Sequence, residues 1–329
     1  MTKPTPAATA RPHDPDVRAP LEMARDVRFY LQQTPRQLPS HLLYDALGSA
    51  LFDAICHLPW YRITQAELGL LRRHAGTIGQ AIGPRGRVVE LGCGSGEKLA
   101  ALVTHAGMPG LHAHLVDLSH AALARSVQTL AMLKGSETRV TTHHASYEDG
   151  LLALPSGGAE PTLIVFLGSN IGNFDAPGAA ALLRLVRAAL RPGDALLLGA
   201  DLVKPERDLL LAYDDPLGLT AAFNKNLLVR LNRELRADFD LGRFAHRAVW
   251  RPEASRVEMH LVSLAAQDVD LKGAELQLAL EEGEIIWTES SYKFEATGLR
   301  RIVEPAGFVQ RQQWVDEDAR FALTLFAAA

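Results

Sequence analysis

The apolar positions of the chain change spacing repeatedly through its central part. Short runs rich in Val, Leu and Ile alternate with stretches that carry an apolar residue at every third or fourth position. The first pattern predicts buried strands and the second predicts amphipathic helices. We expect these strands and helices at residues 87–91, 97–106, 112–117, 120–133, 139–143, 148–153, 162–167, 177–190 and 194–202. Such alternation is typical of a parallel sheet with right-handed crossovers.

The segments that precede this alternation predict helices. Residues 21–57 carry apolar side chains at helical spacing, and LPWYRIT then interrupts the pattern. A further helix is expected over 64–82, with Thr64 as its N-cap and Glu67 completing a capping box. The first 20 residues are rich in Pro, Ala and Thr and lack an apolar core, so we expect a disordered tail and no secretory signal.

The alternation stops at Lys204. Residues 206–236 predict helices with a bend at AYDDPLGLT, and the segments HRAVW, RVEMHLVSL, LQLAL and EIIWTE predict strands. From Gly298 onward the pattern predicts a helix, a glycine turn and two strands, which fit best at the edge of the first sheet. We therefore expect an α/β fold that is interrupted by an insertion over about 204–290.

Composition narrows the class of protein. The chain has 329 residues, 47% hydrophobic and 22% charged, as in an ordinary globular protein of one or two domains. A net charge of −4 gives no electrostatic reason to expect nucleic acid or a membrane as partner, and no apolar run approaches a membrane span. The two cysteines, Cys56 and Cys93, fit no metal or redox spacing. We expect a cytoplasmic monomer that binds no metal.

The segment RVVELGCGSGEK, residues 87–98, is the most informative motif. A strand, a glycine-rich turn and a helix open a nucleotide-binding sheet, because such a turn lets the backbone approach a ligand and directs N–H groups at it. Three interpretations compete: a packing turn, a dinucleotide site and an S-adenosylmethionine site. The G-x-G-x-G spacing of Gly92, Gly94 and Gly96, preceded by the acidic Glu90, favours S-adenosylmethionine over the dinucleotide pattern G-x-G-x-x-G.

Two later strand ends add candidate cofactor contacts. Asp117 ends the second strand, where a carboxylate accepts hydrogen bonds from both ribose hydroxyls. Ser146 and Tyr147 follow the third strand, where they suit contact with the edge of adenine and stacking on its face. These positions extend the expected cofactor site across three neighbouring strands.

The loop after the fourth strand, LGSNIGNFD, carries the next candidates. An asparagine amide offers both a donor and an acceptor, so it can orient an amine lone pair. The alternative is a turn that uses Gly and Asn for positive φ angles. For Asn170 both interpretations stay open, whereas Gly172 already supplies a flexible position, which favours a functional role for Asn173.

Several motifs resemble the L-histidine Nα-methyltransferase family of ergothioneine biosynthesis, a branch of the class I S-adenosylmethionine-dependent methyltransferases. The resemblance runs from about Tyr44 to the C-terminus. Its carriers are YDALGSALFDAICHLPWYRIT, VVELGCGSGEK, FLGSNIGNF, GADLVKPERDLLLAYDDPLGLTAAFNKNLLVRLNRELRADFD, RVEMHL and TESSYKF. The glycine loop is shared by many methyltransferases, whereas the AYDD…TAAFN…LNREL…ADFD run is specific to this family.

The resemblance implies a Rossmann-like class I methyltransferase sheet with an inserted α+β substrate-binding domain. The implied limits are a tail over 1–20, a substrate domain over 21–63 plus 204–291, and an S-adenosylmethionine domain over 64–203 plus 292–329. The resemblance, the glycine loop and the strand ends together predict seven cofactor contacts: Tyr61, Gly92, Gly94, Lys98, Asp117, Ser146 and Tyr147. The implied substrate contacts are Tyr44, Gly168, Asn173, Tyr213, Met259, Glu289 and Ser291.

Each implied role has a chemical reason. Asn173 would hold the α-amine, Tyr213 and Tyr44 would complete the candidate catalytic set, and Glu289 with Ser291 would read an imidazole ring. Residues two apart in a strand share a face, so that carboxylate and that hydroxyl can engage the two ring nitrogens together. Tyr44, Tyr61 and Phe174 are expected to attract the growing cation by cation–π interaction.

The implied reaction is methylation of L-histidine to its trimethyl betaine, hercynine. Two alternatives stay open: methylation of another, aromatic amino acid or small amine, and a binding protein without activity. Three segments differ from the family pattern: GCGSGEK replaces a GSGTSEK-like loop, Ser146 replaces an aspartate, and Arg62 with Ile63 replaces Tyr-Pro.

Overall fold

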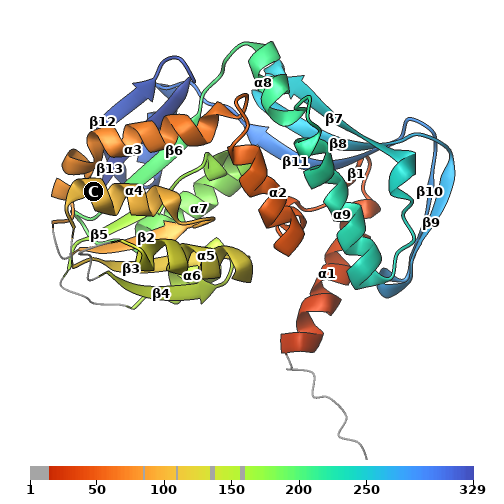
Figure 1. Cartoon of the computed structure of the whole chain (residues 1–329), viewed down its shortest axis with the longest axis horizontal. Helices are drawn as coiled ribbons and strands as arrows, with labels where there is room; N and C mark the ends of the chain where they lie inside the picture. The colour runs from red at the N-terminus through yellow and green to blue at the C-terminus, as the bar shows by residue number, and fades with distance from the viewer. Residues whose placement is uncertain (1–14, 84–85, 109, 134–137, 156–159) are drawn as a thin grey trace, which may run out of the picture.

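The computed structural model describes residues 15–83, 86–108, 110–133, 138–155 and 160–329. Its strands form a seven-stranded sheet, a four-stranded sheet and a two-stranded hairpin. Figure 1 shows the two larger sheets side by side, with helix α2 (Ala46–Cys56) between them. Helix α1 (Pro15–Leu31) begins within the stretch that was expected as a tail, and the rest of that stretch lies outside the described residues.

The larger sheet has the strand order β12-β13-β6-β5-β2-β3-β4. Its strands are β2 (Arg87–Leu91), β3 (His112–Asp117), β4 (Arg139–His144), β5 (Thr162–Phe166), β6 (Ala195–Asp201), β12 (Phe308–Asp316) and β13 (Phe321–Ala328). The first five strands of the chain in this sheet pair in parallel, and β13 pairs antiparallel with β6 and β12. The expected Rossmann-like class I methyltransferase sheet, with the C-terminal strands at one edge, is therefore confirmed.

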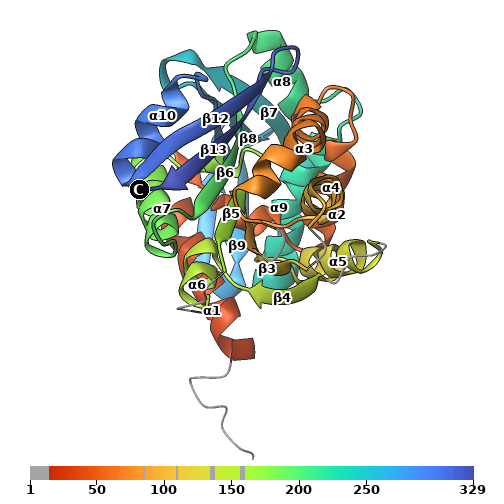
Figure 2. The same cartoon turned by 90° about the vertical axis from the view of Figure 1, so that its left-hand side faces the viewer.

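Helices cover both faces of this sheet, as Figure 2 shows. One layer contains α3 (Arg62–Gln80), α4 (Glu97–Ala106) and α5 (His120–Ala131), and the other contains α6 (Tyr147–Leu152), α7 (Ala176–Ala188) and α10 (Gly298–Val303). Successive strand residues point to opposite faces, so Val88 joins the core under the first layer and Val89 the core under the second. This double burial explains why the strands read as continuous apolar runs.

Three strands between β6 and α10 join β1, from the N-terminal part of the chain, in the second sheet, whose order is β1-β11-β8-β7. Its elements are β1 (Arg36–Gln37), β7 (Phe244–Arg251), β8 (Arg256–Ser263) and β11 (Ile285–Tyr292), with α8 (Glu206–Tyr213), α9 (Leu219–Leu235) and the hairpin of β9 (Gln267–Leu271) and β10 (Leu276–Leu280). The expected α+β insertion is confirmed. One apolar core continues from the first helix layer into this part, and the domain limits remain a prediction.

Three local predictions were wrong. The helix expected over 21–57 is broken, since β1 and a 3-10 turn at Ser40–Leu43 separate α1 from α2. Pro35 and Pro39 flank β1, and proline interrupts helices because it lacks the N–H group. β9 was not predicted, because its five residues gain their partner only through pairing with β10.

The predicted capping box at the start of the next helix is also wrong. Helix α3 begins at Arg62, and its N-cap Tyr61 makes no side-chain capping bond. Thr64 and Glu67 are instead buried within the helix, at 8% and 0% exposure. A capping pattern is local, whereas these side chains find partners in other elements.

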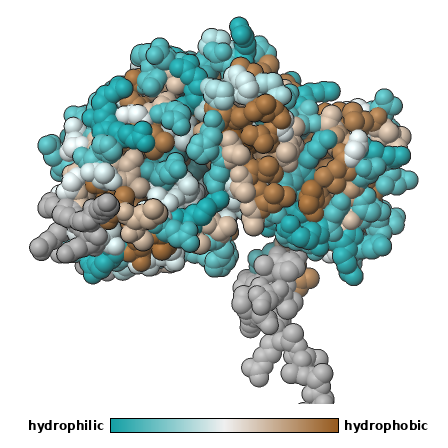
Figure 3. Space-filling view, viewed as in Figure 1, coloured by the Kyte–Doolittle hydropathy of each residue, from teal (hydrophilic) through white to brown (hydrophobic). Residues whose placement is uncertain are grey.

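The strand order reverses between β2 and β5: β3 and β4 follow on one side of β2, and β5 and β6 on the other. In sheets of this kind, ligands bind at such a reversal, beyond the carboxyl ends of the strands. The loop with Gly92, Gly94 and Gly96 follows β2, and the loop from Gly168 to Asn173 follows β5. Helix α2 lies across this edge, and Figure 3 shows apolar surface over it, where Leu47 is 49% exposed. Within the described residues, no helix is long and apolar enough to cross a membrane.

Candidate active site

A cavity of about 450 Å³ lies between the two sheets. All predicted substrate contacts line it, although they come from five separate segments: Tyr44, Gly168, Asn173, Tyr213, Met259, Glu289 and Ser291. The structure thus brings together residues that are up to about 250 positions apart in the sequence. Their individual roles toward a ligand remain predictions.

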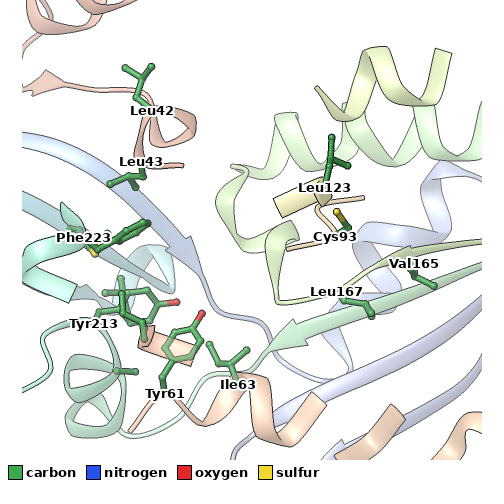
Figure 4. Packing of buried hydrophobic residues seen from close by; sticks show 14 of the residues in the cluster. Leu42, Leu43, Tyr61, Ile63, Cys93, Leu123, Val165, Leu167, Tyr213 and Phe223 are labelled. Atoms are coloured by element: carbon green, nitrogen blue, oxygen red, sulfur yellow. The ribbon is translucent and has the colours of Figure 1, made fainter. Parts of the chain in front are cut away.

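Aromatic rings form one wall of this cavity. The Phe52 ring lies 5.7 Å from Tyr44, 6.0 Å from Tyr61 and 5.8 Å from Phe223, measured between ring centroids. Figure 4 shows Tyr61 and Tyr213 side by side, with centroids 6.4 Å apart. A methylated ammonium in such surroundings gains cation–π attraction without competing hydration.

The membership of this aromatic wall differs from the expectation. Phe174 does not line the cavity; its ring packs on Tyr147 at 6.3 Å, on the other side of the loop. Phe52 and Phe223 take part instead, and sequence reasoning missed them. Both lie in segments that carried the family resemblance, ALFDAI and TAAFN, but an apolar ring in a helix is indistinguishable from a core residue until the fold is known.

The opposite end of the cavity is polar. Glu289 in β11 is 9% exposed, and burial raises its pKa to about 7, against the opposing effect of the Lys293 cation. Met259 in β8 is its antiparallel register partner and supplies an apolar wall beside it. Ser291 lines the same cavity, as expected for a residue two positions along the strand.

Behind Ser291 lies a buried cation that the sequence did not reveal. The Lys293 ammonium is 2.8 Å from Tyr213 Oη, 2.9 Å from Ser291 Oγ and 3.0 Å from Asp201 Oδ2. Asp201 Oδ1 also accepts a bond of 2.6 Å from Lys204. A lysine after a strand is ordinarily a surface residue, and no sequence signal marks this one as buried.

Two further cavities, of about 650 and 900 Å³, adjoin the glycine loop and share Phe52 and Asn170 with the first cavity. Six of the predicted cofactor contacts line one or both of them: Tyr61, Gly92, Gly94, Lys98, Asp117 and Tyr147. Tyr44 and Asn173 line both the first cavity and the 650 Å³ cavity. Tyr44 and Asn173, which are expected near the reacting amine, therefore lie where these two cavities meet.

The chemistry of these walls fits S-adenosylmethionine. Gly92 has a φ of 76°, and a Cβ there would lie 2.7 Å from Asn170 Nδ2 and 2.9 Å from Tyr147 Oη. The Asp117 carboxylate accepts from the backbone N–H of Gly94 at 3.2 Å, and burial raises its pKa. A close backbone and a half-buried carboxylate suit a ligand with ribose hydroxyls.

Glu90 adds an unpartnered polar atom beneath the loop. Its Oε2 is buried without a hydrogen-bond partner among the described residues, and burial raises the pKa of this carboxyl to about 8. A buried acceptor without a partner costs about 1–3 kcal/mol, which favours a ligand or water that supplies a donor. The acidic residue that was expected to precede the loop therefore has capacity left for such a contact.

Glu67 links the two loops of the site. Its Oε2 lies 2.7 Å from the Lys98 ammonium and 2.8 Å from the backbone N of Gly168, and the side chain is completely buried. Gly168 has a φ of 74°, and a Cβ there would lie 2.9 Å from Lys98 Nζ. Glu67 fixes the entry to the loop after β5, and the capping-box interpretation concealed this role.

Ser146 follows β4, as expected, and begins the next helix. It is the N-cap of α6, where its hydroxyl accepts a bond of 3.1 Å from Asp149 N and lies 3.1 Å from Asp149 Oδ2. It lines none of the three cavities, so its contact with adenine stays a prediction.

Two pairs of side chains join α2 to α5 and to the residue before α5, at the border of the 650 Å³ cavity, which is the candidate cofactor cavity. Asp53 in α2 forms an ion pair with Arg125 in α5, and both residues line the 650 Å³ cavity. Ser49 also donates to Ser119 across the same gap, at 3.1 Å. These contacts hold α2 over the cofactor cavity. Across the described ranges, no three His, Cys, Asp or Glu side chains are grouped so as to hold a metal ion.

Comparison with known proteins gives the family. A family model described as "Histidine-specific methyltransferase, SAM-dependent" matches residues 23–328. The chain is 38% identical to the histidine N-alpha-methyltransferases of Mycobacterium tuberculosis and Mycolicibacterium smegmatis, over 93% and 92% of its length and 95% and 94% of theirs. It is 30% identical to the ergothioneine biosynthesis protein 1 of Schizosaccharomyces pombe, over 83% of its length and 36% of that protein. The chain therefore belongs to the family of S-adenosylmethionine-dependent, histidine-specific methyltransferases.

Proposed function

We propose that the protein transfers methyl groups from S-adenosylmethionine to the α-amino nitrogen of L-histidine and forms the trimethyl betaine, hercynine. One observation supports this substrate above others: the buried carboxylate of Glu289 and the hydroxyl of Ser291, two positions apart in β11, line the same cavity. An imidazole ring offers one N–H and one bare nitrogen, which match this pair. An apolar side chain would leave both groups without partners, at a cost of about 1–3 kcal/mol each.

The chain's part in the reaction is to position and desolvate the amine. S-adenosylmethionine supplies the electrophilic methyl group and carries its own leaving group, so no residue has to activate either. The α-amine must be neutral to attack. Even a peptide α-amino group has a pKa of about 8, and the carboxylate of a free amino acid raises the pKa of its amine further, so the bound amine must first lose a proton to water. Asn173, at the junction of the two cavities, accepts an amine N–H and aims the lone pair.

The aromatic wall serves the later methylations. Each transfer leaves a larger and more weakly hydrated cation on nitrogen, and the trimethylated product is permanently charged. Tyr44 and Phe52 line the cavity on the side where it meets the cofactor cavity. Their ring faces stabilise the cation without a hydrogen bond, which the final product can no longer donate.

The names of the relatives bear on how the product is used. The mycobacterial relatives are named for histidine, and the Schizosaccharomyces relative for ergothioneine biosynthesis. We propose that hercynine made here enters a biosynthesis of the ergothioneine type. Deletion of the gene would then remove both hercynine and its sulfur-containing derivative from cell extracts, and added hercynine would restore the latter.

Titration calorimetry tests the substrate directly. With S-adenosylhomocysteine present, we expect L-histidine to bind and L-tryptophan and L-tyrosine to bind far more weakly. Binding of an aromatic amino acid without binding of histidine would instead support the alternative, a methyltransferase for another amino acid.

A further inference from the structure

Lys293 lies behind the side-chain pocket with an ammonium group whose donors are all used. Its side chain is 0% exposed, and its three N–H groups are matched by the three oxygen atoms of Tyr213, Ser291 and Asp201, at 2.8 to 3.0 Å. A buried cation is tolerated when it is fully paired in this way. It therefore has no donor left for a ligand and acts on the pocket through its neighbours.

The neighbouring hydroxyls are constrained in turn. Tyr213 donates to Ser291 Oγ at 2.8 Å, and Lys293 donates to the same oxygen at 2.9 Å. A serine hydroxyl has two acceptor positions and one proton. Both acceptor positions of Ser291 are then filled, and its own proton is the one hydrogen-bonding function that remains for the cavity.

We propose that Lys293 is a positioning residue that fixes the Ser291 hydroxyl as a hydrogen-bond donor toward the substrate. The pocket then pairs an acceptor, Glu289, with a donor, Ser291. Neutral imidazole satisfies both, because one ring nitrogen carries a proton and the other does not, whereas imidazolium carries two protons and leaves Ser291 facing a donor. This inference rests on the proposed function and explains how that pocket selects the neutral ring.

Lys293 can be replaced without leaving a buried carboxylate unpaired. Asp201 keeps the ion pair with Lys204 at 2.6 Å when Lys293 is removed, so no buried carboxylate is left alone. Methionine has a similar unbranched shape and no donor, so Lys293→Met removes the hydrogen bonds and keeps much of the packing.

The test compares histidine and cofactor kinetics in Lys293→Met, Ser291→Ala and the double variant. In Lys293→Met we expect KM for histidine to rise about tenfold or more, with KM for S-adenosylmethionine within about twofold of the native value. Lys293 also lowers the pKa of Glu289, so the assays are run well above pH 7, where Glu289 is ionised; there, replacement of Lys293 in the Ser291→Ala background should cost less than about threefold. If Lys293→Met does not fold, Lys293→Gln replaces it: the amide removes the charge, leaves the Asp201–Lys204 ion pair in place and has two donors for three acceptors, so the same direction of change is expected.

The possible outcomes separate the inference from the function on which it rests. Native protein that methylates no histidine overturns both. Native protein that methylates histidine, with Lys293→Met unchanged in KM for histidine, overturns the inference alone. Equal losses for histidine and cofactor, or fully additive losses in the double variant, also overturn it, because they indicate a general structural role.

Discussion

Met259 and Glu289 are register partners on the adjacent antiparallel strands β8 and β11. Directly opposed residues of such strands place their side chains on the same face, so the apolar wall and the acid of the pocket stand next to each other. The Glu289 carboxyl is buried at this position, and burial raises its pKa to about 7. The side-chain pocket is thus a property of strand pairing between segments that lie far apart in the sequence.

Replacement of Glu289 should affect histidine far more than the cofactor. In Glu289→Ala the imidazole N–H loses its acceptor in a buried site, which costs about 1–3 kcal/mol, or about 5- to 150-fold in affinity. Calorimetry should show this loss for histidine and a change within about twofold for S-adenosylhomocysteine, since Glu289 lines neither of the cavities beside the glycine loop. Equal weakening of both ligands would contradict the assignment of this pocket.

Histidine binding should strengthen as pH rises through about 7. Glu289 accepts a hydrogen bond from imidazole as a carboxylate, and its pKa is raised to about 7, with Lys293 opposing the effect of burial. The substrate ring loses its extra proton over the same range, near its ordinary pKa of about 6.5. Glu289→Gln removes the titrating carboxyl of the protein, so the affinity of this variant for histidine should vary less between about pH 6 and about pH 8. An unchanged pH dependence in Glu289→Gln would show that this carboxyl does not titrate on binding.

The same pKa shift has the opposite effect on the unliganded fold. A carboxyl with a raised pKa in the folded state contributes stability below its ordinary pKa of 4.5, and this contribution is lost as pH rises to about 7. Thermal unfolding without ligand should show this decline in the native protein relative to Glu289→Gln. A difference between the two proteins that does not change across that range would contradict the shift.

Gly92 should be required for the cofactor beyond its effect on stability. Gly92→Ala places a Cβ 2.7 Å from Asn170 Nδ2, at a φ of 76°. Gly218 has the same φ of 76° with no atom within 4 Å of a Cβ, so Gly218→Ala is a matched control for the backbone strain. Both variants should lose about 1–2 kcal/mol of unfolding free energy, and only Gly92→Ala should lose affinity for S-adenosylhomocysteine. Comparable affinity in the two variants would place the cofactor away from this loop.

The ion pair between Asp53 and Arg125 should contribute modestly to cofactor retention. Both side chains are about one-third exposed, and such pairs contribute about 1 kcal/mol or less. Asp53→Asn should therefore raise the dissociation rate of S-adenosylhomocysteine by a few-fold, because α2 is held less firmly over the cavity. Glu304→Gln breaks the exposed pair with Arg300 away from the site and serves as the control. A rate in Asp53→Asn equal to that of the control would show that this pair does not retain the ligand.

The sequence predicted the larger sheet well because its signals are local. Its central strands β2, β3, β5 and β6 are short, largely apolar runs buried on both faces, and the loops at Gly92 and Gly168 follow two of those runs directly. The second sheet was predicted less completely, since β1 has two residues and exists only through pairing with β11, about 250 positions later. No local pattern carries that information.

The site divides in the same way. Asn173 and Asp117 were identified because they stand at strand ends, where position alone indicates chemistry. The roles of Glu67 and Lys293 were not identified: Glu67 was interpreted as part of a capping box, and a lysine after a strand is ordinarily a surface residue until the fold buries it. The aromatic wall of the cavity was predicted in part. Tyr44 and Tyr61 line it as expected, whereas Phe52 and Phe223 take the place of Phe174.

Mass spectrometry of the reaction products tests the central claim most directly. The native protein would be supplied with a mixture of all common amino acids and with S-adenosylmethionine labelled in its methyl group. We expect L-histidine alone to gain label, up to three methyl groups, all on the α-nitrogen. Labelled methyl groups on tryptophan, tyrosine or another amine, with histidine unlabelled, would contradict it.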